Sequence, residues 1–477
     1  MTAASDQEIC FMSGRELAKV IRQRKLSSRE VMSAFLRQIA RLNPKINAII
    51  AKLDDEQCLR LADDADRQLA RGDEIGPLHG LPFAFKDLDP AVGFPFTRGS
   101  KIFRDFMPSE DSVLVERLRR AGVIAIGKTN VSEFGMGSHT YNEVYGTTLN
   151  PYDVTKTPGG SSGGAGAALA GGLLPLASGS DLGGSLRNPA NFNNIVALRP
   201  TVGLVPSVPT ALPFLGFSVK GPMGRSVEDV AFLLSAMAGA DARDPAVYPS
   251  DPNVFAEPLE RDFRNVRVAW CLDLGGLPLD QRVRSVLDAQ RKTFEDLGCI
   301  VEDACPDLAD ADGIFLTIRA WNYWHTLGAV LEEHRQQMKP EAVWQIESGR
   351  KLTGTDVAEA MARHGELMQR MRLFQEKYEF LVCAVNQVPP FDATIHWPRE
   401  IAGVPMEHYI AWMKSAYWIT PTFCPAISVP AGFTADGLPV GIQIVGRYRD
   451  DRGVLQIAHS FEHATEFGKK RPAVALV

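Results

Sequence analysis

The chain of 477 residues is 45% hydrophobic and 23% charged, the composition of an ordinary globular protein long enough to bury a substantial core. Its 51 Lys and Arg residues against 57 Asp and Glu residues give a net charge of −6, so no basic surface is expected to attract nucleic acid or anionic lipid. The seven cysteines form no C-x-x-C pair and are odd in number. Neither a disulfide framework nor a structural zinc site is therefore expected.

The chain gives no sign of a targeting or membrane segment. Residues Met1–Met12 hold neither the basic region nor the apolar region of a secretory signal. The longest apolar run, Ala165–Ala177, is interrupted by Gly171, Gly172 and Pro175. It is also shorter than the roughly 20 residues that a bilayer-spanning helix needs. We therefore expect a cytoplasmic protein that does not enter a membrane.

Two capped helices are predicted at the start of the chain. Ser13 with Glu16, and Ser27 with Glu30, match the S-x-x-E capping box. The second helix has apolar residues at helical spacing, and Asn43-Pro44 is expected to end it. Those apolar residues are Val31, Phe35, Leu36, Ile39 and Leu42.

Helices and apolar strands then alternate to the end of the chain. Further helices are predicted over residues 56–71, 113–120, 280–297 and 454–463. Strands are predicted over residues 81–86, 123–126, 266–270, 380–388 and 441–445. Because these strands are apolar throughout, they indicate a sheet covered on both faces. We predict an α/β fold with a large mixed, mostly parallel central β-sheet covered by α-helices on both faces.

No internal repeat, low-complexity linker or long charge run marks a domain boundary, so a single domain over residues 1–477 is predicted. Residues 311–418 differ from the rest because they are mostly helical and hold six of the seven tryptophans. We expect this segment to be a helical, aromatic-rich insertion or cap over the sheet. The six are Trp321, Trp324, Trp344, Trp397, Trp412 and Trp418.

The most informative stretch is rich in glycine, with the sequence TPGGSSGGAG over residues 157–166. The alanine-rich run at 165–170 follows, which indicates a loop that aims backbone N–H groups at a ligand and then enters a helix. A flexible linker is disfavoured because an apolar helix and strand come directly after it. A phosphate-binding loop is disfavoured because the stretch has neither a Gly-Lys-Ser/Thr ending nor a clean G-x-G-x-x-G.

A second small cluster, GSDLGGSLRNP over residues 179–189, places Ser185 after two glycines. Consecutive N–H groups beside a hydroxyl are what a nucleophile needs next to an oxyanion hole. His139 is the one histidine near the loop, and a structural role is the favoured interpretation for it. Lys86 is the better candidate base, because desolvation at the end of an apolar strand would lower its pKa. The alternative for Lys86 is a simply solvated side chain.

Together these three pieces resemble the amidase signature hydrolases. The signature of that family is a GGSSGG stretch, a later D-x-GGS-x-R-x-P motif, and an upstream lysine in a G-x-P…K-D motif. Here these are Gly159–Gly164, Asp181–Pro189, and Gly80-Leu81-Pro82 with Lys86-Asp87. The resemblance extends along nearly the whole chain, through the GKTN, VPAG and GLPVGIQI motifs at residues 127–130, 429–432 and 437–444.

The resemblance implies a Ser-Ser-Lys triad that acts without a metal or a cofactor. Ser185 would be the nucleophile that forms an acyl-enzyme, Ser161 a proton relay on a cis peptide bond, and Lys86 the base, neutral when active. Backbone N–H groups of Leu182 and Gly183 would hold the oxyanion, together with those of Gly184 and Ser185.

Two further features lie beside the expected nucleophile. Leu182 stands where many members of the family have Thr, which should alter the wall of the acyl pocket. Asp181 and Arg187 form an opposite-charge pair, for which an ion pair that braces the loop is favoured over substrate contact.

The expected function is hydrolysis of a carboxylic amide to an acid and ammonia or an amine, through an acyl-enzyme on Ser185. The alternative is a glutaminase-type subunit of a tRNA-dependent amidotransferase complex. The expected partner is a small-molecule amide, with no nucleic acid and no membrane, and a homodimer is left open. A bulky or aromatic amide is favoured, because aromatic residues are expected over the active-site mouth, with a packed helix core as the other interpretation. These residues are Trp321, Tyr323, Trp324, Trp344, Trp397, Tyr409, Trp412, Tyr417 and Trp418.

Overall fold

The computed structural model describes residues 5–476, so the first four residues of the Met1–Met12 segment lie outside it. Its helices are α1 Asp6–Phe11, α2 Gly14–Arg22, α3 Ser28–Ile46, α4 Asp55–Arg71, α5 Val113–Arg120, α6 Gly163–Ala170, α7 Arg187–Phe192, α8 Val227–Met237, α9 Gln281–Asp288, α10 Arg291–Asp296, α11 Ala311–His334, α12 Pro340–Arg350, α13 Gly354–Lys377, α14 Lys414–Tyr417 and α15 Asp451–Thr465. Within this range, no helix combines the length and apolar character that crossing a bilayer requires.

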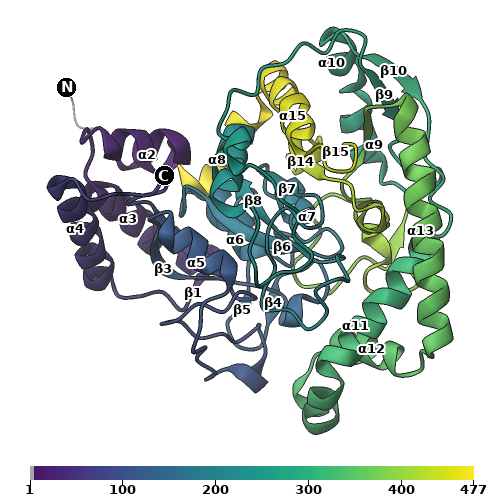
Figure 1. Ribbon diagram of the computed structural model, residues 1–477, viewed down its shortest axis with the longest axis horizontal. Helices are drawn as coiled ribbons and strands as arrows, with labels where there is room; N and C mark the ends of the chain where they lie inside the picture. The colour runs from purple at the N-terminus through teal and green to yellow at the C-terminus, as the bar shows by residue number, and fades with distance from the viewer. Residues whose placement is uncertain (1–4, 477) are drawn as a thin grey trace.

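The strands form one large sheet, a three-stranded sheet and two short hairpins. They are β1 Ile49–Ile50, β2 Pro82–Lys86, β3 Ile124–Thr129, β4 Tyr141–Asn142, β5 Gly146–Thr147, β6 Ala177–Asp181, β7 Val196–Arg199, β8 Val219–Gly224, β9 Arg267–Trp270, β10 Ile300–Asp303, β11 Phe380–Ala384, β12 Glu400–Ile401, β13 Val404–Pro405, β14 Ala426–Phe433 and β15 Pro439–Val445. Figure 1 shows β6, β7 and β8 of the large sheet at the centre, with α2–α4 at one side and α11–α13 at the other.

The eight-stranded sheet has the order β10-β9-β11-β15-β14-β7-β8-β6. Strand β9 runs parallel to both β10 and β11, and the other five neighbouring pairs are antiparallel. The α/β class and the mixed sheet are confirmed, but the sheet is not mostly parallel as predicted. When both faces of a strand are buried, its residues are apolar throughout whether it pairs parallel or antiparallel. The composition therefore did not reveal the direction of these strands.

Most predicted elements are present, with two differences in helix boundaries. The helix predicted over residues 280–297 is two helices, α9 and α10, which separate at Ala289 and Gln290. Helix α3 does not end at Asn43-Pro44 but continues to Ile46. Pro44 lies in the last turn, where only one N–H donor is lost, and Asn47 ends the helix with a left-handed backbone at φ 49°.

Two cysteines are paired, which their spacing in the sequence did not predict. Cys271 and Cys305 form a disulfide with Cα atoms 5.4 Å apart. Cys271 directly follows β9 and Cys305 comes soon after β10, and these strands are parallel neighbours, so both residues emerge at the same edge of the sheet. The other five cysteines are buried as free thiols.

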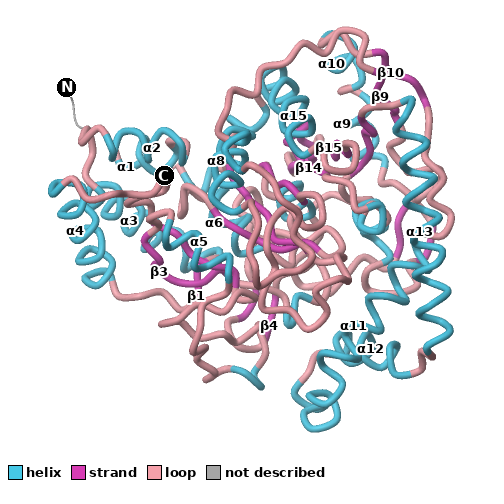
Figure 2. Tube along the Cα trace, in the orientation of Figure 1, coloured by secondary structure: helices cyan, strands magenta, loops and turns pink. Residues whose placement is uncertain are grey.

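Residues 311–418 contribute both to a helical arm and to the main sheet. Helix α11 packs against both α12 and α13 at the edge of the molecule, where Figure 2 shows the three helices. The same segment then supplies β11, which lies between β9 and β15 inside the eight-stranded sheet. The helical part therefore joins the sheet through a strand of its own.

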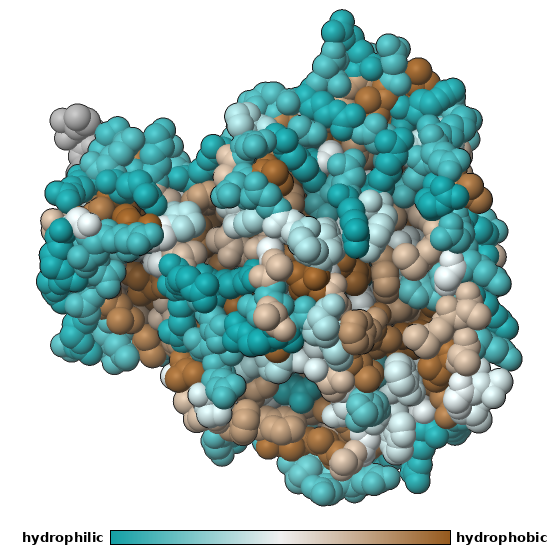
Figure 3. All heavy atoms as spheres, viewed as in Figure 1, coloured by the Kyte–Doolittle hydropathy of each residue, from teal (hydrophilic) through white to brown (hydrophobic). Residues whose placement is uncertain are grey.

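Hydrophilic side chains dominate the left and upper edges of the face in Figure 3, while apolar ones gather over its middle and lower part. The interior holds a cluster built on the main sheet and a second one under α11 and α13. The second cluster also includes residues of β9, β11, β14 and β15, so the arm packs its apolar surface against the main sheet.

The contact between α11 and α12 depends on a glycine. A Cβ at Gly349 would lie 2.0 Å from the carbonyl oxygen of Ala320 on α11. We expect Gly349→Ala to force the helices apart and to destabilise the fold by about 1–3 kcal/mol, seen as a lower midpoint in thermal unfolding. Gly365→Ala on α13 is the matched control, because no described atom outside the backbone of its own helix and its chain neighbours lies within 4 Å of its Cβ position. Equal midpoints for the two variants would contradict this packing.

Candidate active site

Lys86 ends β2 and is fully buried, with an exposed fraction of 0%. Its Nζ lies 2.9 Å from the Oγ of Ser161, 2.8 Å from the Oγ of Ser162 and 2.9 Å from the Oγ of Ser180. Ser161 and Ser162 precede α6, and Ser180 lies on β6. The amine therefore joins the small sheet, the Gly-rich loop and the main sheet at one point.

Burial lowers the pKa of Lys86 from its ordinary value to about 7. The charge of Lys220 lowers it further, while Asp89 and Asp181 raise it without offsetting the loss of hydration. No carboxylate among residues 5–476 lies within ion-pair distance of Nζ. Near neutral pH much of the lysine is thus uncharged and able to accept a proton.

The Gly-rich loop is fixed by hydroxyls that sequence reasoning missed. The peptide bond between Gly160 and Ser161 is cis, in agreement with the resemblance. The hydroxyl of Ser138 donates to the carbonyl of Gly160. Thr140 Oγ1 donates to the carbonyl of Gly159 at 2.8 Å and accepts from the N–H of Gly163 at 3.1 Å. Both residues lie well before the loop in the sequence, and no motif pointed to them.

Ser185 lies in the loop between β6 and α7 and borders the same cavity as Ser161. Its backbone carbonyl accepts a hydrogen bond from the N–H of Ser162 at 3.3 Å, which joins the two serine-bearing loops. The Ser185 side chain makes no hydrogen bond within the described part of the chain, and the residue is 8% exposed. Its hydroxyl is thus unengaged at the wall of the cavity.

One of the N–H groups predicted to hold the oxyanion already has a hydrogen-bond acceptor in the structure. The N–H of Gly184 donates to Oδ1 of Asp181 at 2.8 Å, so this group is already engaged. The N–H groups of Gly183 and Ser185 have no acceptor among the residues described. A Cβ at Gly183 would lie 2.7 Å from Cζ of Phe315, so a larger residue does not fit there. Gly184 thus fixes the loop, and its neighbours keep free donors.

Asp181 and Arg187 are both fully buried and form a bidentate ion pair at 3.0 Å, which agrees with the favoured bracing role. Arg199 approaches Asp181 from β7 at 3.3 Å. Burial by itself would raise the pKa of Asp181, but the two guanidinium groups hold it well below its usual value. The carboxylate therefore stays ionised and accepts the N–H groups of Gly184 and Leu186.

The cavity at Ser185 has a volume of about 400 Å³. Apolar and aromatic side chains form much of its wall, and α11 closes one side with Asn322, Tyr323 and Thr326. The apolar and aromatic residues are Leu88, Pro90, Phe96, Phe134, Leu182, Pro209, Ala211 and Tyr323.

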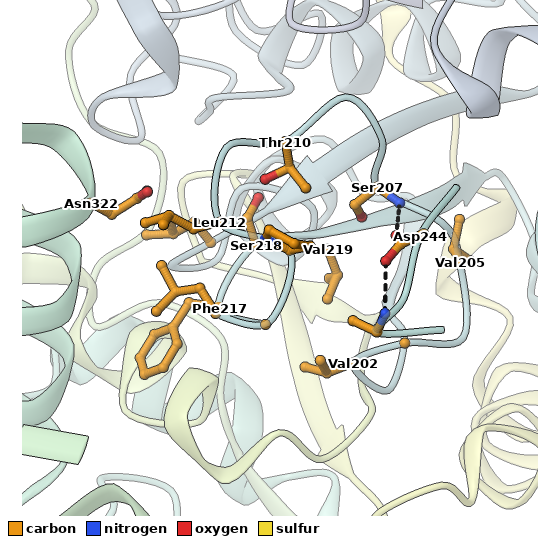
Figure 4. A pocket seen from close by; sticks show the side chains of 16 residues that line it. Val202, Val205, Ser207, Thr210, Leu212, Phe217, Ser218, Val219, Asp244 and Asn322 are labelled. Carbon is orange, nitrogen blue, oxygen red and sulfur yellow. Dashed lines mark hydrogen bonds between the residues drawn. The ribbon is translucent and has the colours of Figure 1, made fainter. Parts of the chain in front are cut away.

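A smaller cavity of about 70 Å³ continues from this one, and the two share Leu182, Thr210, Ser218 and Asn322. Figure 4 shows its wall, in which apolar side chains such as Val205 lie near Asp244. That carboxylate is occupied, because it accepts the N–H groups of Ser207 and Ala246 at 2.8 and 3.1 Å.

Of the nine aromatic residues expected over the mouth, only Tyr323 lines the catalytic cavity. Four others are buried in the core under α11 and α13, and Trp418 packs against it partly buried; the four are Trp397, Tyr409, Trp412 and Tyr417. Trp344 is half-exposed and stacks on His408. The interpretation of these aromatics as helix core is correct for most of them. The apolar wall comes instead from Phe96 and Phe134, which the sequence did not single out.

His139 does not reach the catalytic cavity. It is buried against Tyr141 and Phe391, with ring centroids 4.8 and 5.8 Å away. Burial lowers its pKa to about 4, and neither ring nitrogen has a hydrogen-bond partner in residues 5–476. The structural interpretation of this histidine agrees with its surroundings.

A protein-family model described as Amidase matches residues 30–455. The chain belongs to the amidase signature family. It is 36% identical over 483 residues to an acylamidase of Rhodococcus erythropolis, with 99% of each chain covered. It is 32% identical to a Glutamyl-tRNA(Gln) amidotransferase subunit of Dechloromonas aromatica, with 96% of this chain and 98% of that protein covered. A bacterial aryl acylamidase of the same family has a similar structure, with a TM-score of 0.89, 25% identity, and coverage of 97% and 99% of the two chains.

Membership of this family makes the protein an amidohydrolase that acts on carboxylic amides. The Ser185 hydroxyl lines its cavity, the buried amine of Lys86 lies 2.9 Å from the cavity-lining Ser161, and the loop of Ser185 carries free backbone N–H donors. These are the groups that acyl transfer requires: a nucleophile, a base and a site for the developing oxyanion.

We expect the activity to depend on a group that titrates near the lowered pKa of Lys86. Below pH 7 the amine is protonated and cannot accept a proton, so kcat/KM should fall about tenfold per pH unit on the acid side. Above pH 7 it should rise to a plateau, as measured by kcat/KM for one amide across pH 5–10. His139→Asn is the control and should leave the midpoint unchanged. A midpoint that moves in this variant would assign the titration to the histidine.

Proposed function

We propose that the protein hydrolyses a bulky or aromatic amide through an acyl-enzyme on Ser185. The observation that carries this proposal is the buried Lys86 amine, 2.9 Å from the Ser161 hydroxyl at the edge of the cavity that Ser185 also lines. A neutral amine in this position is a base with a hydroxyl beside it to relay the proton. No metal and no cofactor take part in the proposed reaction.

In the first half of the reaction, Ser185 Oγ attacks the amide carbon as its proton passes to Ser161. Ser161 gives up its own hydroxyl proton to Nζ of Lys86. The carbonyl oxygen gains negative charge, which the free N–H groups of Gly183 and Ser185 stabilise. When the tetrahedral intermediate collapses, the C–N bond breaks and the proton returns through Ser161 to the departing nitrogen.

In the second half, water attacks the ester carbon of the acyl-enzyme and gives its proton to Lys86 by the same route. The acid leaves, and the Ser185 hydroxyl is restored. The same base serves both halves, so Lys86 is needed for acylation and for deacylation.

The amide substrate is proposed to carry a bulky or aromatic group, for which the cavity wall gives support. Phe96, Phe134 and Tyr323 offer aromatic faces, and the side cavity beyond Leu182 extends the apolar surface. The similarity to an acylamidase and to an aryl acylamidase agrees with such a substrate.

The alternative is glutamine hydrolysis for an amidotransferase, as the name of the Dechloromonas relative suggests. Glutamine carries an α-ammonium group, which needs an anionic partner when it leaves water. Among the described residues that line the catalytic cavity, none is Asp or Glu. This absence favours an acylamide over glutamine.

The roles of the triad can be tested with a fluorophosphonate, which reacts with an activated serine. We expect Ser185 to carry the label, as mass spectrometry of its peptide would show. Ser185→Ala and Lys86→Ala should each lower kcat by about 10⁴-fold or more, because they remove the nucleophile and the base. Ser161→Ala should keep a small residual rate, since water relays protons poorly in its place. A label on Ser161 or Ser162 would contradict the assignment.

The substrate class can be tested by comparing 4-nitroacetanilide with glutamine and acetamide. We expect kcat/KM for the anilide to exceed that for either small amide by about 10²-fold, because only the aryl group fills the apolar wall. Ser185→Ala serves as the blank for contaminating activity. Equal or better turnover of glutamine would replace the proposal with its alternative.

A further inference from the structure

The catalytic cavity contains an imbalance of charge. Two cationic side chains, Arg98 and Lys220, line it, and no acidic side chain of the described residues does. Lys220 forms an ion pair with the buried Asp89, so its charge is compensated. Arg98 is therefore the cavity-lining cation without an acidic partner among the described residues.

The guanidinium of Arg98 is held by aromatic rings and not by an acid. Its Cζ lies 5.5 Å from the ring centre of Phe103 and 5.1 Å from that of Phe134. No carboxylate or carbonyl oxygen in residues 5–476 lies within hydrogen-bond or ion-pair distance of it. Because the guanidinium contacts rings and no acceptor oxygen, its N–H donors stay available.

Asp87, the buried acid whose charge acts on Arg98, is already engaged by other groups. The oxygens of Asp87 accept the N–H of Thr97 at 3.2 Å, the hydroxyl of Thr97, and the N–H of Gly99 at 3.4 Å. Lys128 lies 3.8 Å from the same carboxylate. Asp87 therefore supplies no hydrogen bond to Arg98, and burial lowers the pKa of this half-buried guanidinium.

The backbone around Arg98 is in an unfavourable conformation that a ligand site would explain. Arg98 has φ 56° and Phe134 has φ 53°, both in the left-handed region that non-glycine residues rarely adopt. The N–H of Phe134 donates to the carbonyl of Arg98 at 2.8 Å. The two residues with left-handed backbone are thus joined by a hydrogen bond. Both residues line the catalytic cavity.

We propose that Arg98 binds a carboxylate on the substrate, so that the preferred amides carry an anionic group away from the scissile bond. This rests on the proposed function, because the carboxylate belongs to the amide that Ser185 attacks. Guanidinium and carboxylate match in a bidentate geometry, and the partly desolvated setting strengthens the pair. Arg98 is then a substrate-binding residue that selects among amides.

The test uses matched amides on the full chain. The monoanilide of glutaric acid is compared with its methyl ester, and 4-acetamidobenzoate with its methyl ester, so that the carboxylate stands on the acyl or the amine side. We expect the enzyme to prefer the acid of at least one pair by about 10-fold or more in kcat/KM. Arg98→Met should lower kcat/KM for that acid about 100-fold, mainly through KM, and leave its ester within about threefold. Arg98→Lys should recover part of the loss.

Arg104→Met is the matched control, because Arg104 is exposed on the same segment and does not line the cavity. It should leave both preferences unchanged. A preference for the esters in both pairs, or an equal loss for acid and ester in Arg98→Met, would overturn the proposal. Turnover of the esters in either case would leave the amidase assignment intact, so the two failures are distinguishable.

A binding measurement makes the test independent of turnover and of the stability of the variant. Glutarate and benzoate, added to the unmodified protein, should slow fluorophosphonate labelling of Ser185, and acetamide at the same concentration should not. Arg98→Met should lose this protection while its Ser185 still reacts. If neither carboxylate protects the unmodified protein, Arg98 is not a carboxylate site.

Discussion

A lysine amine buried without a carboxylate partner is the constraint on which the active site depends. A charged amine in such a place would lose its hydration with no counter-ion to replace it, so the neutral form is favoured. Lys128, on the neighbouring strand β3, is equally buried but lies 3.8 Å from Asp87. Lys86 instead lies beside serine hydroxyls. A hydroxyl can accept a hydrogen bond from an uncharged amine or donate one to it. Because its partners are hydroxyls and not a carboxylate, Lys86 can be neutral and act as a base.

The ion pairs of Asp181 with Arg187 and Arg199 lie behind the reacting atoms and not among them. Asp181 takes two guanidinium groups and the N–H groups of Gly184 and Leu186, and so determines the path of the nucleophile loop. Removal of one partner would leave an uncompensated buried charge, which costs far more than a surface pair. The loop is thus held by ionic contacts, while Lys86, Ser161 and Ser185 remain free to exchange protons among neutral groups.

The sequence was sufficient to locate β2, the Gly-rich loop and the loop of Ser185, because their motifs are local and depend on residue type. It was insufficient wherever the outcome depends on packing between distant segments. Strands buried on both faces carry no record of direction, so the antiparallel pairs were missed. Ser138 and Thr140 hold the Gly-rich loop from about twenty residues earlier, a contact that only the folded chain creates. The aromatic residues of 311–418 were visible, but helical spacing does not distinguish a core from a pocket wall.

A substrate carboxylate at Arg98 would add a negative charge to the cavity that Ser161, the neighbour of Lys86, also lines. Asp89 and Asp181 already raise the pKa of Lys86 from a distance, and an unpaired substrate carboxylate would raise it further. A protonated Lys86 would no longer serve as the base. A carboxylate paired with Arg98 takes the local charge from +1 to zero, so the complex holds no excess negative charge beside the base. Anion binding at Arg98 is therefore compatible with a neutral Lys86, since the guanidinium that holds the substrate balances its negative charge.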